Sequence, residues 1–321
     1  MRPLFLAVLV SALLSASVPA WPAEIEPLPA LPPIPADNSM TPQKIELGKI
    51  LFFDPRLSGS KWISCATCHN PAMGYTDRLP RALGHAMSEG PRNTPTILNA
   101  AFIKAQFWDG RADGLEAQAL GPIQADVEMK QTLTQMVNNL KQVPEYVTRF
   151  KEVFGETDPI TPGNIAKAIA TFERTLITPD SPFDRYLRGD KLALSRDARE
   201  GYRLFQEKGC TACHNGPVLS DGNFHHIKVP GSVDEGRFKV TKNPADLSAF
   251  RTPTLRNVEL TAPYFNNGSV NTLEGAVVVM GNEALNTNIS RKDAVLIADF
   301  LRSLTGTMPK FDYPDLPYTR Y

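Results

Sequence analysis

Residues 65–69 read CATCH, and residues 210–214 repeat the frame as CTACH. These two segments contain all four cysteines of the 321-residue chain. In a Cys-x-x-Cys-His frame, two thiols can each form a thioether to a haem vinyl group, and the histidine then lies under the iron. A redox dithiol does not need the histidine. A zinc site would not explain why a histidine directly follows the second cysteine in both frames. We therefore predict two covalent haem c groups, attached through Cys65, Cys68, Cys210 and Cys213, with His69 and His214 as proximal ligands.

The sequence around the two frames also repeats. The frames lie 145 residues apart, and a Gly-x-x-Leu-Phe segment precedes each of them. Such a period is too long for a solenoid unit, so it predicts two copies of one domain. The matching pairs are 48–52 with 201–205, 94–99 with 252–257, and 164–176 with 292–304, the last pair without a gap.

The repeated segments have helical rather than alternating periodicity. Apolar residues recur at i, i+3, i+4 and i+7 in 294–301, with Gly306 expected to end that helix, and 131–154 is expected to be helical as well. The proline-rich stretches 27–35, 91–95 and 309–317 are expected to be extended loops. The predicted fold is mainly α, with two cytochrome c-like helical domains that each hold one covalent haem c. The Thr-Pro-Asp-Ser-Pro segment at 178–182 divides them into residues 24–178 and 179–321.

The N-terminus is typical of an export signal. Arg2 precedes an apolar run over 4–14, and small residues lead to Ala20 or Ala23. The run is too short to span a bilayer comfortably, so a cleaved signal peptide over 1–23 is favoured over a permanent anchor. This predicts a periplasmic protein with no membrane segment after cleavage. The formal net charge of zero gives no indication of a nucleic-acid partner.

Each iron needs a sixth ligand or an open position. In the first copy the spare imidazole is His85, in a glycine-flanked loop. The second copy offers several side chains, among which a methionine thioether is the usual source of a high haem potential. These candidates are Met280, Met308, His225 and His226.

The segment GPIQADVEM at 121–129 has no counterpart in the second copy. A carboxylate beside an open iron could take a proton from peroxide and return it to the departing oxygen. Asp126 and Glu128 are both candidates for this carboxylate.

Taken together, these motifs resemble the bacterial di-haem cytochrome c peroxidase family over essentially the whole mature length. The resemblance implies that the haem under His69 is the low-potential peroxidatic site, which His85 blocks at rest and vacates when the other haem is reduced. It implies that Glu128 is the acid–base carboxylate and that Gln118 lines the same pocket. The segments that carry the resemblance are 65–70, 83–85, 90–96, 105–112, 121–129, 210–215 and 279–281.

The same resemblance assigns the haem between His214 and Met280 as the high-potential, electron-accepting centre, with Trp108 between the two haems. It implies a calcium ion bound by the Asn93 side chain and by the backbone carbonyls of Thr261 and Pro263, which are oxygen ligands suited to a hard cation.

One departure concerns residues 264–268. The family usually has Tyr-x-His-Asp-Gly there, whereas this chain has Asn266 and Asn267. This changes the expected hydrogen bonding around the C-terminal haem but not its ligation.

The expected reaction is H2O2 + 2 e⁻ + 2 H⁺ → 2 H2O, with electrons from a small cytochrome c or cupredoxin. The resemblance also allows a homodimer. Two alternatives remain open at this point: a MauG-like oxidase that modifies a protein, and a di-haem electron carrier with both irons permanently six-coordinate. Met280 argues against the first, because that branch is understood to carry a tyrosine ligand there. The carrier would need neither Glu128 nor a displaceable His85.

Overall fold

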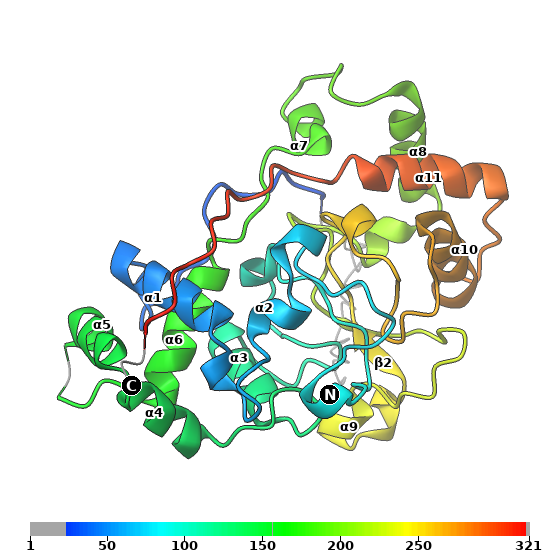
Figure 1. Cartoon of the computed structure of the whole chain (residues 1–321). Helices are drawn as coiled ribbons and strands as arrows, with labels where there is room; N and C mark the ends of the chain where they lie inside the picture. Colours follow the sequence, from blue (N-terminus) through cyan, green and yellow to red (C-terminus); the bar gives the residue numbers. More distant parts are fainter. Residues whose placement is uncertain (1–23, 156, 319–321) are drawn as a thin grey trace, which may run out of the picture.

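The structure is a computed structural model that describes residues 24–155 and 157–318, so the predicted signal peptide lies outside the described residues. The described chain is mainly helical, as predicted, and none of its helices is long and apolar enough to span a bilayer (Figure 1). The helices are α1 (Pro42–Phe53), α2 (Cys65–Cys68), α3 (Leu115–Gln124), α4 (Leu133–Lys141), α5 (Pro144–Phe154), α6 (Pro162–Glu173), α7 (Pro182–Leu187), α8 (Arg196–Glu207), α9 (Phe238–Thr241), α10 (Leu273–Ala284) and α11 (Arg291–Arg302). Strands β1 (Phe224–His226) and β2 (Ala249–Arg251) form an antiparallel pair, with His225 opposite Phe250.

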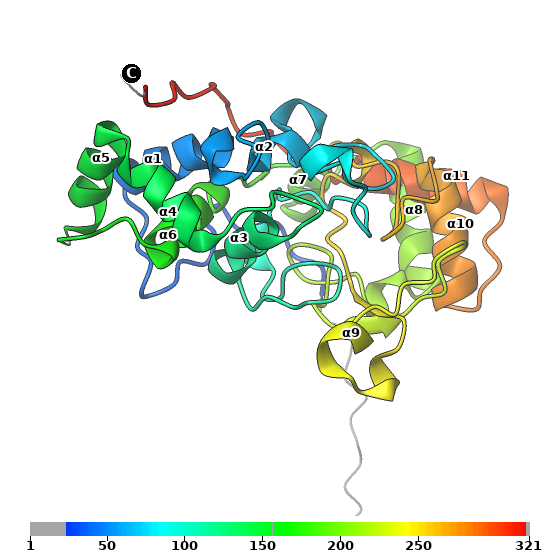
Figure 2. The ribbon, with the colours of Figure 1, turned by 60° about the horizontal axis from the view of Figure 1, so that its bottom comes forward.

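The helices form two groups at opposite ends of the molecule. Figures 1 and 2 place α1, α4, α5 and α6 at one end and α8, α10 and α11 at the other. Each group has its own apolar core, one around Phe52 and Phe172 and the other around Phe205 and Phe300. The segments that carry the Cys-x-x-Cys-His frames lie between the two cores.

Two glycines let the central helices of each group approach closely. A Cβ atom at Gly48 of α1 would collide with the backbone carbonyl of Ala168 in α6. A Cβ atom at Gly201 of α8 would collide with the carbonyl of Leu296 in α11 in the same way. Ala168 and Leu296 are paired by the gapless alignment of 164–176 with 292–304, so the two close approaches occupy matching positions.

Gly48→Ala is therefore expected to destabilise the protein, because the added methyl group must push α1 away from α6. Overpacking of this kind costs about 1–3 kcal/mol of unfolding free energy. Urea denaturation measures the loss. Gly163→Ala, in the open first turn of α6, is the matched control and should leave the protein unchanged or slightly more stable. Equal stability of wild type and Gly48→Ala would contradict the packing argument.

Within the predicted boundary segment, Thr178 and Ser181 are buried, and Thr178 is bonded to both halves. The Thr178 hydroxyl donates to Asn257 Oδ1 at 2.6 Å and accepts from Asn99 Nδ2 at 2.8 Å. Both asparagines have left-handed backbone conformations, and their N–H groups donate to the carbonyls of Leu176 and Leu304 respectively. The junction is thus a rigid element rather than a mobile linker.

The stretch 131–154 is helical, as expected, and it forms two helices because Pro144 begins α5 instead of continuing α4. One local expectation was wrong. Helix α11 ends at Arg302 rather than at Gly306. Gly306 serves a different purpose, since a Cβ there would collide with the Thr178 carbonyl.

The two ends of the chain cross over between the halves (Figure 1). The Glu24 carbonyl accepts from the Gly216 N–H at 3.2 Å in the C-terminal half. At the other end, Phe311 stacks on Phe53 with ring centroids 5.1 Å apart, in the N-terminal half. The N-terminal segment therefore packs on the C-terminal half, and the C-terminal segment packs on the N-terminal half. The predicted boundaries had assigned each segment to its own half.

Candidate functional site

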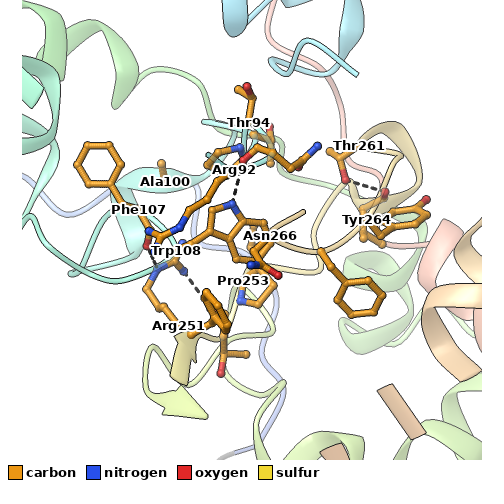
Figure 3. A pocket seen from close by; sticks show the side chains of 18 of the residues that line it. Arg92, Thr94, Ala100, Phe107, Trp108, Arg251, Pro253, Thr261, Tyr264 and Asn266 are labelled. Atoms are coloured by element: carbon orange, nitrogen blue, oxygen red, sulfur yellow. Dashed lines mark hydrogen bonds between the residues drawn. The ribbon is translucent and has the colours of Figure 1, made fainter. Parts of the chain in front are cut away.

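One continuous cavity of about 510 Å³ lies between the two halves. Its wall includes both Cys-x-x-Cys-His frames, together with residues from α3, α6, α10 and α11. Figure 3 shows Trp108, Arg92 and Arg251 converging in this cavity from different segments. The predicted attachment residues all line it, namely Cys65, Cys68, His69, Cys210, Cys213 and His214.

The two proximal histidines are held in the same way. His69 Nδ1 lies 3.2 Å from the Tyr75 carbonyl, and His214 Nδ1 lies 3.0 Å from the Leu219 carbonyl. Burial lowers the pKa of both imidazoles, which favours the neutral form. A hydrogen bond from Nδ1–H to a carbonyl orients the ring and leaves Nε2 free for a metal. Both rings are therefore suited to be axial ligands.

The four cysteines are unpaired thiols. Burial raises the pKa of each one, whereas redox-active dithiols require a lowered pKa. Cys65 and Cys68 form the single turn of α2, where the Ser64 N–H donates to the Thr67 hydroxyl at 3.0 Å. Unpaired neutral thiols on the wall of a large cavity, each pair beside an orientated histidine, fit two covalent haems.

Of the two candidates Asp126 and Glu128, the structure brings Glu128 to the cavity that contains the first frame. Glu128 lines the cavity, as does Gln118 of α3, whereas Asp126 is exposed and does not. Burial raises the pKa of Glu128, and the nearby charge of Arg111 acts in the opposite direction. A raised pKa makes a carboxyl group better able to hold a proton and pass it on.

The His85 ring is not part of the cavity wall, although Gly84 beside it is. The His85 N–H donates to the Glu128 carbonyl at 2.7 Å, and its buried Nδ1 has no hydrogen-bond partner among the described residues. The next two residues, Ala86 and Met87, both have left-handed backbones, which is uncommon for residues other than glycine. The structure thus joins the predicted blocking ligand to the Glu128 backbone but leaves its ring outside the cavity.

The structure separates the four candidates for the sixth ligand of the second haem. Met280 of α10 lines the cavity with His214. The Met308 sulfur accepts from Asn257 Nδ2 at 3.7 Å, and that side chain packs on the N-terminal core. His225 reaches the cavity but its Nε2 lies 2.8 Å from an Asp221 carboxylate oxygen, and His226 is exposed. Met280 therefore fits best, since it lines the cavity and its sulfur has no hydrogen-bond partner among the described residues.

The three predicted calcium ligands, Asn93, Thr261 and Pro263, all line the cavity. Asn93 is buried, and its Nδ2 donates to the Leu79 carbonyl at 2.7 Å. Asn266 is one of the two residues that depart from the family pattern. Its backbone carbonyl accepts a hydrogen bond from the backbone N–H of Asn93 at 2.8 Å. The three predicted calcium ligands are thus all neutral oxygen atoms. Among the described residues, no cluster of acidic side chains accompanies them.

A different group, formed by Cys213, Asp221 and His225, has metal-ligand side chains within reach of one another. Because Cys213 is expected to be consumed by a thioether bond, we assign this group to the haem surroundings.

Trp108 joins the two halves inside the cavity. Its indole Nε1 donates to the Asn93 carbonyl at 2.9 Å, and its own carbonyl accepts from the Arg251 N–H at 2.9 Å (Figure 3). The indole is therefore held by both halves on the wall of the cavity that contains the two frames.

Sequence reasoning did not single out several charged residues on the cavity wall, among them Glu173 and Arg251. Glu173 is the last residue of α6, and burial raises its pKa to about 8. The repeat alignment contained a signal for it, because Leu301 occupies the matching position in the second copy. A carboxyl group thus replaces an apolar side chain in one half.

Comparisons with known proteins agree with this geometry. A family model described as di-haem cytochrome c peroxidase matches residues 42–192. The chain is 46% identical to a cytochrome c551 peroxidase of Nitrosomonas europaea, over 94% of this chain and 90% of that protein. It is 48% identical to a cytochrome c551 peroxidase of Pseudomonas aeruginosa (86% and 82%), and 41% identical to the methylamine utilization protein MauG of Methylorubrum extorquens (89% and 84%). Among solved structures, a MauG-like protein associated with microbial copper homeostasis superposes with a TM-score of 0.78 at 28% identity, covering 89% of this chain and 96% of that one.

Proposed function

The chain belongs to the di-haem cytochrome c peroxidase family, and on that premise we propose that it reduces hydrogen peroxide to water in the periplasm. The electrons would come from a small cytochrome c or cupredoxin. The observation that carries the proposal is a single cavity lined by the cysteines and histidines of both attachment frames, with the half-buried carboxylate of Glu128 on the same wall. The haems would supply the iron that binds peroxide and the electrons that reduce it.

The N-terminal half would contribute the proton chemistry. Glu128 would accept a proton from peroxide at its carboxylate and return it to the oxygen that leaves as water. Gln118, on the same wall, would orient the peroxide by hydrogen bonding. The raised pKa of Glu128 supports this role, since a group that must take and release a proton works best with a pKa near the working pH.

The C-terminal half would accept electrons. Met280 and His214 are suited to hold its iron on both sides, and a thioether ligand favours a high reduction potential. Trp108 would lie on the path between the two haems. A calcium ion held by Asn93, Thr261 and Pro263 would bridge the halves.

We propose further that the two halves arose by internal duplication, with domains at 24–178 and 179–321. The matching helix contacts at Gly48 and Gly201 support this origin. The export signal at 1–23 supports the periplasmic location, and a homodimer is consistent with the family.

The strongest rival is an oxidase that modifies a protein, since the chain is also 41% identical to a MauG protein. Met280 favours the peroxidase, because that branch is understood to have tyrosine at this position. A permanently closed electron carrier would not need a half-buried carboxylate such as Glu128 on the cavity wall.

Adding cyanide to the half-reduced holoprotein tests the proposal. We expect cyanide to bind at the N-terminal iron alone, because His85 would leave that iron once the other haem is reduced, whereas Met280, which lines the cavity with His214, would close the other iron. Optical and electron paramagnetic resonance spectra, recorded with calcium and with a chelator, would report both sixth ligands. Absence of cyanide binding at either haem would identify an electron carrier and exclude the peroxidase.

A further inference from the structure

Arg251, the last residue of β2, carries a buried charge that no carboxylate of the described residues balances. The residue is 6% exposed. Its Nε donates to the Phe107 carbonyl at 3.3 Å and its Nη1 to the Thr252 carbonyl at 2.9 Å. Both partners are neutral backbone groups. A buried charge without a counter-charge is strongly unfavourable, so this guanidinium lacks its natural partner.

Other buried arginines of the described chain do have acidic partners. Arg256 lies 2.7 Å from an Asp184 oxygen, and Arg174 lies 2.8 Å from Glu116. Burial lowers the pKa of Arg251 to about 10, which still leaves the side chain cationic at neutral pH. Arg251 is the buried arginine of the described residues whose charge is not balanced by a carboxylate. We therefore expect an anion from outside the polypeptide to bind it.

The position of Arg251 indicates where that anion would lie. Arg251 lines the haem cavity beside Trp108 (Figure 3). The Thr252 carbonyl that it contacts also accepts from the Ser220 hydroxyl at 2.6 Å. Ser220 directly follows Leu219, whose carbonyl orients His214. Arg251 is thus fixed to the loop that carries the proximal ligand of the C-terminal haem.

We propose that Arg251 binds a carboxylate of the haem attached at Cys210 and Cys213, and that it is a positioning residue which raises the reduction potential of that haem. The inference rests on the proposed function, because it requires haem at the second frame. A haem carries carboxylate side chains into the cavity with it, and the planar guanidinium matches a carboxylate with two parallel hydrogen bonds. Reduction adds negative charge to the haem, so a neighbouring cation stabilises the reduced form.

The test is a spectroelectrochemical titration of the holoprotein for wild type, Arg251→Gln and Arg251→Lys. In Arg251→Gln we expect both haems to remain attached, and the redox equilibrium of the C-terminal haem to shift toward the oxidised form by about tenfold, or about 59 mV for one electron. Arg251→Lys should shift it less, because the charge remains while the paired hydrogen bonds are lost.

Arg237→Gln is the matched control. Arg237 comes from the same region and stacks on Phe224 with its guanidinium 3.7 Å from the ring centroid, but it does not line the cavity. Its loss should leave both potentials unchanged.

The outcomes separate the inference from the proposed function. Two attached haems with an unchanged C-terminal potential in Arg251→Gln would overturn the inference alone, as would a larger shift at the N-terminal haem. Fewer than two covalent haems in the wild type, measured by intact mass and by the pyridine haemochrome, would overturn the proposed function instead. Should Arg251→Gln fail to accumulate, Arg251→Lys decides, and an unchanged potential in that variant also rejects the inference.

Discussion

Glu128→Gln is expected to lower the peroxidase turnover number by roughly 10²- to 10⁴-fold, the usual contribution of a positioned acid–base group. The amide keeps the size and hydrogen-bonding capacity of the side chain but cannot take up a proton from peroxide. Glu128 lines the cavity together with the first frame, and burial raises its pKa. Steady-state turnover with a reduced small cytochrome c measures the effect.

Asp126→Asn is the matched control for this variant. Asp126 lies two residues away and is exposed outside the cavity, so the same chemical change there should leave turnover near the wild-type value. Haem content and the spectrum of the half-reduced protein should be unchanged in both variants. If Glu128→Gln turned over peroxide at a near-normal rate, Glu128 would have to be removed from the mechanism.

The chemistry of the site was readable from the sequence wherever it depended on residues close together in the chain. A Cys-x-x-Cys-His frame defines its own geometry, and the structure brings both frames to one cavity. The capping threonines before Pro42 and Pro162 likewise fix the starts of α1 and α6 locally. The choice between Asp126 and Glu128 could not be made in this way, because it depends on which carboxylate faces the cavity once α3 has packed.

Features that depend on distant segments were not predictable from one sequence. The burial of Arg251 results from contacts with residues more than 140 positions away, such as the Phe107 carbonyl. The packing of each terminal segment on the opposite half has the same origin, since Glu24 contacts Gly216 and Phe311 contacts Phe53. Such contacts leave no periodic pattern in the sequence, because only the three-dimensional path of the chain decides them.

Asp184→Asn is expected to cost about 3–5 kcal/mol of unfolding free energy, the penalty for removing one partner of a buried ion pair. The side chains of Asp184 and Arg256 are both fully buried, at 0% exposure, with Nη1 and Oδ1 separated by 2.7 Å. Asp184 Oδ1 also accepts from the Leu28 N–H at 3.0 Å, so the pair fixes the N-terminal segment onto the C-terminal half. Without the carboxylate charge, Arg256 stays buried with only neutral partners.

Urea denaturation of the holoprotein at neutral pH measures this loss, and Asp180→Asn is the control. Asp180 pairs with Arg188 at the exposed surface only a few residues away, so its substitution should not change the midpoint measurably. A double-mutant cycle with Arg256→Met separates the pair itself from the other bonds of Asp184, because the second substitution should cost less once the first is present. If Asp184→Asn unfolded at the same urea concentration as the wild type, the buried ion pair would not be the interaction that fixes the N-terminal segment to the C-terminal half. The N-terminal segment would then depend on apolar contacts such as that of Ile25 with the C-terminal core.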